Sequence, residues 1–329
     1  SEARGNESLF ADYRKSMARR ARGLEAPYAA VECVEASLGE DFDAGLSFER
    51  ETFKKLVVST QSEALRHAFF VERASTKIDG LAKDTAKQDI RRAAVIGCGT
   101  MGGGIAMNFA NAGIPVTVLE AEDSALQKGL DIIRGNYTAS VAKGRIAQDK
   151  MDGCMGLITG VTDYAELGEP DMVIEAIFEK MAVKKEVFAK LDAVCPPDTI
   201  LATNTSTLDV NEIAAATSRP EKVIGTHFFS PANIMRLQEN VRGAKTSDET
   251  IASTMALAKK LGKVGVLVGV CDGFVGNRML YAYSRQANFL LEEGALPQQI
   301  DKAIFDFGFP MGPFAMGDLA GLDVGWLVR

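Results

Sequence analysis

The feature that most constrains the fold is a glycine-rich turn between an apolar run and a helix-forming segment. Residues 93–96 (Ala-Ala-Val-Ile) lead directly into Gly97-Cys-Gly-Thr-Met-Gly102, and small or apolar residues continue up to Gly113. In a strand–turn–helix unit that binds a dinucleotide, the first glycine permits a tight turn, the second lets the backbone approach the pyrophosphate, and the third lets helix and strand pack closely. We assign these roles to Gly97, Gly99 and Gly102. The N-terminus of the following helix then offers free N–H groups to phosphates.

A second strand with an acid at its end follows at a suitable distance. Residues 115–120 (Pro-Val-Thr-Val-Leu-Glu) end in Glu120, close to the spacing of about 20 residues at which a carboxylate binds the adenosine ribose. A carboxylate there accepts hydrogen bonds from the ribose hydroxyls and repels a 2′-phosphate, which favours NAD over NADP. The alternative is a glycine-rich turn that binds no nucleotide. The strand, helix and terminal acid together favour an NAD site.

Beyond residue 91 the chain alternates between strand-like and helix-like segments. Further strands are expected at 157–161, 171–176, 199–203, 222–227, 235–241 and 264–270, and helices at 123–143, 181–193, 209–216 and 247–261. This alternation predicts an α/β fold, a doubly wound and mostly parallel Rossmann-type sheet with helices on both faces. Such sheets bind ligands beyond the carboxyl ends of their strands. The residues that follow each strand are therefore the candidates for a site.

Three regions are expected along the chain. Residues 1–90 carry apolar residues at helical spacing and include a stretch rich in Lys, Asp and Ala, 72–90, which is interpreted as a linker helix. Residues 91–272 form the dinucleotide-binding domain. Residues 273–329 form an all-helical C-terminal domain, with an apolar helix expected at 279–291. This last domain is expected to be incomplete.

His227 and Glu239 form a candidate pair for proton transfer. His227 lies at the end of an expected strand, and if the chain reverses about Asn233, Glu239 lies opposite it on the next strand. Directly opposed residues of an antiparallel pair have Cβ atoms roughly 4.5–5.5 Å apart. A carboxylate at that distance can hold an imidazole in one tautomer and stabilise its protonated form. The alternative is a partly buried histidine beside an unrelated surface glutamate.

Polar residues also follow the other strands. Glu179 and Lys184 come after 171–176, and Asn204 and Ser206 come after 199–203. Asn277 lies just before the apolar helix expected at 279–291. For Ser206 the alternative is simple helix capping, because Asn, Ser and Thr are all good N-cap residues.

Composition excludes several classes of function. The chain has 329 residues, a net charge of −7 and no long basic run, so nucleic-acid binding is not expected. Five scattered cysteines without a CxxC pair fit a reducing compartment and argue against a metal site or disulfide framework. No apolar run approaches the length of a membrane span. The cytoplasm is the expected location, with the peroxisomal matrix as the alternative.

Five motifs in order resemble the 3-hydroxyacyl-CoA dehydrogenase family. They are Gly97-Cys-Gly-Thr-Met-Gly-Gly-Gly, Ile174-Glu-Ala-Ile-Phe-Glu179, Thr203-Asn-Thr-Ser206, Gly225-Thr-His-Phe-Phe-Ser-Pro and Asp272-Gly-Phe-Val-Gly-Asn-Arg278. The resemblance covers about 93–329. More narrowly, the chain resembles the dehydrogenase part of the multifunctional enoyl-CoA hydratase/3-hydroxyacyl-CoA dehydrogenases of fatty-acid β-oxidation. Residues 1–90 resemble the C-terminal helices of their hydratase/isomerase half and the linker helix that follows.

The resemblance implies an activity and a role for each matching residue. The activity is NAD-dependent oxidation of (S)-3-hydroxyacyl-CoA to 3-oxoacyl-CoA, with His227 as the base and Glu239 as its partner. Ser206 and Asn277 would contact the reacting oxygen of the substrate or hold His227 and the acyl-CoA in place. The cofactor would contact Gly97, Gly99, Thr100, Met101, Gly102, Glu120, Ala176, Glu179, Lys184 and Asn204. No metal ligand is implied. A homodimer or contacts with a hydratase half are the implied protein partners.

Departures from the family leave alternatives open. The chain is expected to be a fragment of a bifunctional enzyme without hydratase activity of its own, and a catalytically weak NAD-binding module is the second hypothesis. A different NAD-linked 3-hydroxyacid dehydrogenase fits less well, because some of those families use a lysine where this chain has a His/Glu pair. Gln238 and Asn240 flank Glu239 with polar groups, which would loosen the dry surroundings of the pair.

Overall fold

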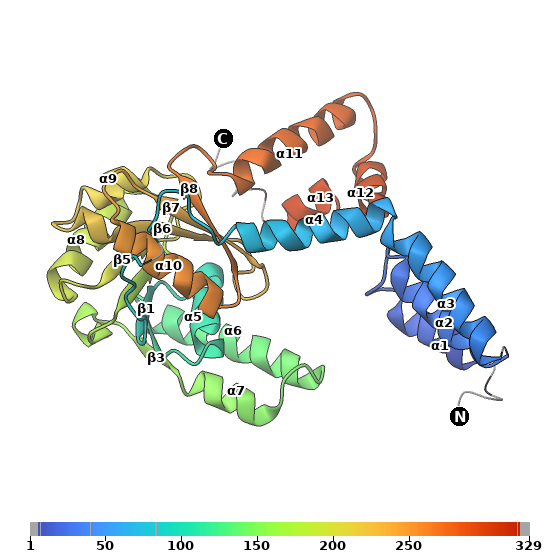
Figure 1. The fold of residues 1–329 in the computed structure, drawn as a ribbon. Coiled ribbons are helices and arrows are strands. Elements are labelled where there is room, and N and C mark those ends of the chain that lie inside the picture. The colour runs from blue at the N-terminus through green and yellow to red at the C-terminus, as the bar shows by residue number, and fades with distance from the viewer. Residues whose placement is uncertain (1–5, 7, 40, 83, 321, 323–329) are drawn as a thin grey trace. The chain divides into compact units, whose positions relative to one another are not determined.

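The computed structural model describes residues 6, 8–39, 41–82, 84–320 and 322 (Figure 1). The chain divides into two compact units, one made of residues 1–74 with 289–319 and the other of residues 75–288 with 320–329. The second unit holds all eight strands of the described chain. It also holds every candidate site residue named above, so the site can be described within this unit alone.

The eight strands form one sheet in the order β3-β2-β1-β4-β5-β6-β7-β8. Their bounds are β1 Ala93–Ile96, β2 Val116–Leu119, β3 Ile158–Val161, β4 Met172–Glu175, β5 Ile200–Thr203, β6 Val223–Phe228, β7 Leu237–Arg242 and β8 Val264–Gly269. Only β6 and β7 pair antiparallel; the other six pairings are parallel. The expected mostly parallel, doubly wound sheet is therefore confirmed. The strand order reverses between β1 and β4, which is where folds of this kind bind ligands.

Helices connect most of the strands. They are α5 Thr100–Asn111, α6 Asp123–Ala142, α7 Gln148–Met155, α8 Met181–Val194, α9 Val210–Ala214 and α10 Asp248–Lys260, with short 3-10 helices at Tyr164–Leu167 and Pro220–Lys222. The sequence did not predict α7. That helix buries only Met151 and Cys154, which is too weak a periodic signal to recognise. In the described part of the chain, no helix is both long enough and apolar enough to cross a membrane.

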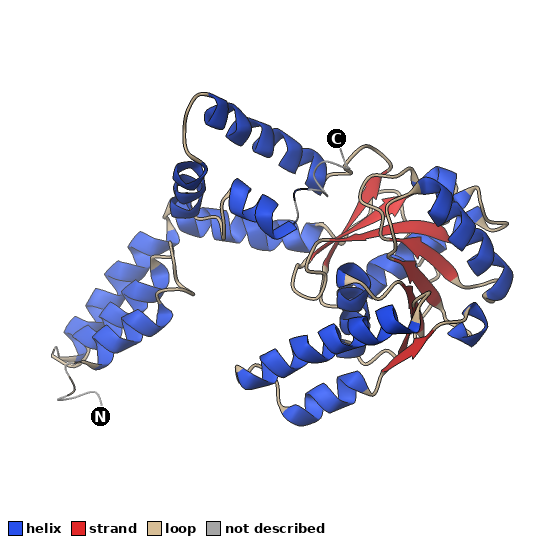
Figure 2. Ribbon diagram, turned by 180° about the vertical axis from the view of Figure 1, so that it is seen from behind, coloured by secondary structure: helices blue, strands red, loops and turns tan. Residues whose placement is uncertain are grey.

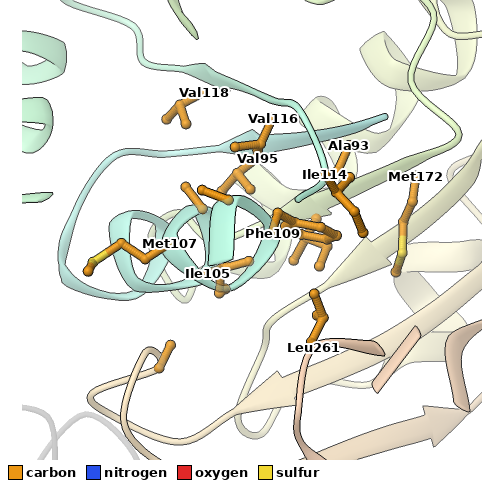
Figure 3. Close-up of a cluster of buried hydrophobic side chains, with 14 of the residues drawn as sticks. Ala93, Val95, Ile105, Met107, Phe109, Ile114, Val116, Val118, Met172 and Leu261 are labelled. Carbon is orange, nitrogen blue, oxygen red and sulfur yellow. The ribbon is translucent and has the colours of Figure 1, made fainter. Parts of the chain in front are cut away.

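Strands β1, β4, β5 and β6 are buried along their whole length because helices cover both faces of the sheet (Figure 2). Successive residues of β1 point to opposite faces. Ala93 and Val95 join a hydrophobic cluster with side chains of α5, α6 and α10, whereas Ala94 and Ile96 join a second cluster with side chains of α8 and α9. Figure 3 shows the first cluster, in which Phe109 of α5 is fully buried. Apolar contacts on both sides thus fix where the carboxyl end of β1 lies.

The other unit is helical. It contains α1 Leu9–Met17, α2 Ala26–Ala36, α3 Phe42–Val57, α4 Thr60–Ala74, α12 Pro297–Phe307 and most of α13 Pro313–Ala320, and α11 Gly276–Glu292 crosses the boundary between the units. The guanidinium of Arg22 donates to the carbonyls of Phe305, Gly308 and Phe309. It also lies 3.9 Å from the ring centroid of Phe305. These carbonyls are at the C-terminus of α12, where a cation is favoured.

The prediction of a linker helix at 72–90 is wrong beyond Ala74. The described residues that follow, up to 92, form turns and extended chain, and Gly80 adopts a φ of 83°. A residue in this left-handed conformation cannot continue an α-helix. Further along, the backbone N–H of Gln88 donates to Oγ of Ser253 at 2.8 Å, and those of Arg91 and Arg92 donate to Oδ2 of Asp171 at 2.8 Å.

Candidate active site

Two of the three glycines in the glycine-rich turn have protein atoms where a side chain would lie. Gly97 has a φ of 100°, and a Cβ there would lie 2.7 Å from the carbonyl oxygen of Ala176. A Cβ on Gly102 would lie 1.9 Å from the carbonyl oxygen of Gly97. A Cβ on Gly99 would meet nothing within 4 Å. Protein therefore fills the space at Gly97 and Gly102, whereas the space at Gly99 is open to a ligand.

The rest of the turn also fits a dinucleotide. Thr100 and Met101 are the first residues of α5, and Thr100 is exposed, so the helix N-terminus faces solvent with free N–H groups. Oε2 of Glu120 accepts a 2.9 Å hydrogen bond from the N–H of Cys98, and Oε1 accepts one from Ala121 at 3.0 Å. These bonds hold the carboxylate beside the turn, at the carboxyl ends of β1 and β2, as the sequence spacing predicted.

His227 and Glu239 lie directly opposite each other on β6 and β7, as predicted. Nδ1 of His227 is 2.8 Å from Oε2 of Glu239. The two side chains are 7% and 0% exposed, so the alternative of a surface glutamate is wrong. An ionised carboxylate can only accept, so Nδ1 donates its proton to Oε2. The neutral ring therefore presents Nε2 as a proton acceptor.

Glu239 is held in its ionised form by several donors. Oε1 accepts hydrogen bonds from the N–H of Val275 at 3.0 Å and from the N–H of Gly276 at 2.8 Å. Burial acts to raise the pKa of Glu239, but the hydrogen bonds from His227, Gly276 and Val275 together outweigh it and lower that pKa. The carboxylate is thus charged and fully paired at neutral pH.

Aromatic side chains shield the His227 ring. Its centroid lies 4.5 Å from that of Phe229 and 5.8 Å from that of Phe274. Phe274 is fully buried and has a φ of 47°. A Cβ on Gly276 would lie 2.5 Å from Cζ of Phe229, so the first turn of α11 packs closely on this ring. Asn277 is the next residue of α11 and is half-buried.

The polar neighbours of Glu239 do not loosen the pair, so that expectation is wrong. Alternate residues of a strand point to opposite faces, and both Gln238 and Asn240 are fully buried. Nε2 of Gln238 donates to Oδ1 of Asn240 at 3.1 Å, and Nδ2 of Asn240 lies 3.1 Å from Sδ of Met255 in α10. They pack on the far side of the sheet from the dyad.

The turn after β5 connects to both sides of the site. Oδ1 of Asn204 accepts a 2.9 Å hydrogen bond from the N–H of Phe228, the residue after His227. Oε1 of Glu179 accepts hydrogen bonds from the N–H of Ser206 at 2.8 Å and from its hydroxyl at 3.1 Å. The acceptors that fix this turn are therefore Glu179 and Oγ1 of Thr205, which accepts from the N–H of Leu208 at 2.9 Å. The sequence had predicted that at least one of the polar residues 204–207 would cap a helix, and Thr205 makes a bond of that kind, although α9 itself begins only at Val210.

Two charged residues of this region are almost completely buried. Lys184 is 1% exposed and Glu175 is 0% exposed, and Nζ of Lys184 lies 2.6 Å from Oε1 of Glu175. The sequence placed Lys184 among the cofactor residues but did not select Glu175. An acid at the end of an otherwise apolar strand, Met172–Glu175, was the signal that could have identified it.

No group of three or more His, Cys, Asp or Glu side chains that could hold a metal ion occurs among the described residues. The site is thus built from a dinucleotide-type turn, a buried His/Glu pair and a polar turn after β5. All three lie at or beyond the carboxyl ends of β1, β4, β5 and β6. This combination defines a Rossmann-type nucleotide-binding protein.

Residues 92–271 match the family described as "3-hydroxyacyl-CoA dehydrogenase, NAD binding domain", and residues 273–329 match "3-hydroxyacyl-CoA dehydrogenase, C-terminal domain". Together with the fold and the motifs above, these matches show that the chain belongs to the 3-hydroxyacyl-CoA dehydrogenase family. The cofactor of the domain at 92–271 is NAD.

Relatives of known name are similar along nearly the whole chain. The "Peroxisomal bifunctional enzyme" of Cavia porcellus is 45% identical over 329 residues, a match that covers 98% of this chain and 45% of that protein. The "Peroxisomal fatty acid beta-oxidation multifunctional protein" of Oryza sativa subsp. japonica is 40% identical, with 100% of this chain and 45% of that protein covered. The chain therefore spans about half the length of these relatives.

Among solved structures, the dehydrogenase part of multifunctional enzyme 1 from C. elegans is similar with a TM-score of 0.62 and 33% identity. That match covers 78% of this chain and 61% of the other. The (S)-3-hydroxybutyryl-CoA dehydrogenase PaaH1 from Ralstonia eutropha gives a TM-score of 0.69 with 36% identity, and covers 73% of this chain and 86% of that chain.

Proposed function

We propose that this protein catalyses the NAD-dependent oxidation of (S)-3-hydroxyacyl-CoA to 3-oxoacyl-CoA in fatty-acid β-oxidation. The observation that carries the proposal is the buried 2.8 Å contact between Nδ1 of His227 and Oε2 of Glu239. The pair belongs to the same sheet as β1, the strand that leads into the glycine-rich turn. The family and the names of the relatives agree with the reaction.

The proton of the substrate hydroxyl would be taken by Nε2 of His227. The resulting imidazolium would be stabilised by Glu239, which is already charged and already oriented by Val275 and Gly276. A histidine suits this role because its imidazole can accept and return a proton at a ring nitrogen. NAD, when bound, supplies the hydride acceptor. Ser206 and Asn277 are proposed to hold the substrate oxygen or the acyl-CoA.

The proposed cofactor residues fall into two groups. The adenosine and pyrophosphate side comprises Gly97, Gly99, Thr100, Met101, Gly102 and Glu120, and the nicotinamide side comprises Ala176, Glu179, Lys184 and Asn204. Glu179 is 30% exposed and can meet a ligand. Lys184 is 1% exposed, so its influence on the cofactor would pass through Glu179.

We also propose the domain boundaries and the cellular context. The dinucleotide-binding domain would occupy 91–272 and the helical domain 273–329, preceded by hydratase-like helices within 1–90. The relatives named above are peroxisomal, which supports the peroxisomal matrix over the cytoplasm. An acyl-CoA substrate is proposed, and a second copy of the chain or a hydratase half is the proposed protein partner.

The proposal is tested by NADH oxidation with acetoacetyl-CoA, comparing the parent chain with His227→Gln. We expect turnover in the parent and a loss of roughly a hundredfold or more in the variant, the usual contribution of a general base. His67→Gln changes the only other histidine, which is exposed on α4, and should retain parental turnover. Equal turnover in the parent and His227→Gln would overturn the assignment of the base. NADH binding without turnover in the parent would favour the NAD-binding module.

A further inference from the structure

A buried cluster of three charges lies between β4 and α8. Nζ of Lys184 lies 2.6 Å from Oε1 of Glu175 and 3.3 Å from Oε2 of Glu179. Both Lys184 and Glu175 are at most 1% exposed, whereas Glu179 is 30% exposed. One cation is therefore shared by two carboxylates, of which only Glu179 reaches solvent.

The buried end of the cluster is anchored in the sheet. Oε2 of Glu175 accepts a 2.7 Å hydrogen bond from the hydroxyl of Thr203 on β5, and Oε1 accepts a 2.8 Å bond from the N–H of Ile177. Oε1 thus has a donor in addition to Lys184, and Oε2 has a donor of its own. Buried charges are tolerated when they are paired and hydrogen-bonded in this way, so Glu175 is a fixed support for the ammonium.

The exposed end of the cluster fixes the turn after β5. Oε1 of Glu179 accepts from the hydroxyl of Thr205 at 2.6 Å, from the N–H and hydroxyl of Ser206 at 2.8 and 3.1 Å, and from the N–H of Thr207 at 3.2 Å. Its other oxygen, Oε2, faces Lys184. Lys184 and Ser206 are therefore linked through the two oxygens of the Glu179 carboxylate.

We infer that Glu175 and Lys184 are positioning residues that act through Glu179 to place Ser206 and the nicotinamide side of the cofactor site. The inference deepens the proposed function and rests on it for the role of Ser206. It assigns a task to Glu175, which lies in the Ile174–Glu179 motif but had no role assigned to it from the sequence. It also explains why Lys184 is buried although the family resemblance places it at the cofactor.

Removing the cation gives the first test. Lys184→Met leaves the carboxylates of Glu175 and Glu179 facing each other without a cation between them, and like charges at close range cannot both stay ionised. We expect the dissociation constant of NADH, measured by fluorescence, to rise roughly ten- to a hundredfold, with kcat lowered as well, because small misplacements in a site cost about that much. Lys185→Met is the matched control, since Lys185 is a surface residue of the same helix that pairs with Glu212, and it should behave like the parent.

Removing one of the two repelling charges gives the decisive test. In Lys184→Met, Glu175→Gln should restore part of the lost NADH affinity and turnover, so that the double variant performs better than Lys184→Met alone. If Lys184 and Glu175 merely filled space in the core, the double variant would be at least as impaired as the single one. That outcome would overturn the inference.

Thermal stability without cofactor gives an independent measurement. In Lys184→Met one carboxylate should have a folded-state pKa above its unfolded value, so the variant should gain stability relative to the parent as the pH falls from about 8 to about 5. The double variant should lack this gain. Tyr164 also interacts with Glu175, but burial raises the pKa of Tyr164, so its phenol stays neutral throughout this range. A pH-independent difference between Lys184→Met and the parent would contradict the inference.

These measurements separate the inference from the proposed function. If the parent chain does not reduce acetoacetyl-CoA, the proposed function fails, but NADH affinity and the pH dependence of stability still test the cluster. Another outcome is that the parent turns over while the double variant matches Lys184→Met in NADH affinity, in turnover and in the pH dependence of its stability. In that case the proposed dehydrogenase activity stands and the positioning role is wrong.

Discussion

The backbone N–H of Gly276 donates a 2.8 Å hydrogen bond to Oε1 of Glu239, the carboxylate whose other oxygen binds His227. Gly276 is the first residue of α11, so the carboxylate also lies at the positive end of a helix dipole. The orientation of the histidine therefore depends on where α11 begins. A change at the start of this helix should reach the dyad without altering either of its side chains.

Gly276→Ala tests this dependence. A Cβ at this position would lie 2.5 Å from Cζ of Phe229 and 2.9 Å from its Cε1, so either the ring or the helix start must move. We expect kcat for acetoacetyl-CoA reduction to fall about tenfold or more, since displacement of an orienting group costs on that scale. NADH affinity should change little, because the glycine-rich turn is not involved.

The matched control is Gly269→Ala at the end of β8. A Cβ on Gly269 would meet nothing within 4 Å, so this variant should retain parental kcat and thermal stability. If Gly276→Ala also kept its full kcat, the contact between α11 and Glu239 would not matter for turnover.

Glu239→Gln tests the charge of the orienting group. The amide keeps the shape of the side chain but removes the negative charge that stabilises an imidazolium, and it can present an N–H to Nδ1, which favours the wrong tautomer. We expect kcat to fall by roughly a hundred- to ten-thousandfold. Steady-state kinetics, with NADH binding measured in parallel, would check this fall in kcat. The control is Glu169→Gln, which changes an exposed carboxylate and should behave like the parent. A loss in kcat of less than threefold or so would contradict a role in proton transfer.

The same carboxylate should give a characteristic acid sensitivity. Because the folded-state pKa of Glu239 lies below its ordinary value of 4.5, its ionisation contributes stability that is complete above that ordinary value. This contribution is lost as the pH falls through the lowered folded-state pKa. The difference in Tm between the parent and Glu239→Gln should therefore narrow on acidification below about pH 4.5. Scanning calorimetry across this range tests the sign, and a difference that widened would be incompatible with the lowered pKa.

Much of the site was predictable because its signals are local in the chain. The glycines at 97, 99 and 102 need specific backbone conformations and contacts, so their spacing specifies a turn type. The opposition of His227 and Glu239 followed from two neighbouring strands and the turn between them, because register in a pair of adjacent strands is set by the turn.

The remainder depends on contacts between distant segments. Val275 and Gly276 reach Glu239 across more than thirty residues of sequence, and no spacing rule links a backbone N–H to a carboxylate that far away. The acid at the end of the apolar strand β4 is visible in the sequence, but the role of Glu175 depends on Lys184 and Thr203, which lie on other elements. The stretch after Ala74 has helical composition, but Gly80 adopts a left-handed conformation and the backbone of Gln88 bonds to Ser253, far away in the sequence.

The three glycines of the turn should separate into two classes when replaced by alanine. Gly102→Ala places a Cβ 1.9 Å from the carbonyl oxygen of Gly97, so it should lower Tm even without cofactor. Gly99→Ala meets no protein atom within 4 Å, so it should leave Tm unchanged and weaken NADH binding, because the pyrophosphate must approach that backbone. Gly135→Ala, in α6 with open space around it, is the control for both. A Gly99→Ala variant that bound NADH normally would show that the cofactor does not approach Gly99.

Glu120 should set the preference for NAD over NADP. Its carboxylate is held beside the glycine-rich turn by the N–H groups of Cys98 and Ala121, and in that position a negative charge repels a 2′-phosphate. Glu120→Gln keeps one of the two acceptor oxygens for those N–H groups and removes the charge. We expect kcat/KM for NADPH to rise relative to that for NADH by about tenfold, the equivalent of 1.4 kcal/mol. Glu122→Gln, two residues further along the chain, is exposed and should leave the ratio unchanged. An unchanged ratio in Glu120→Gln would place the discrimination elsewhere in the adenosine site.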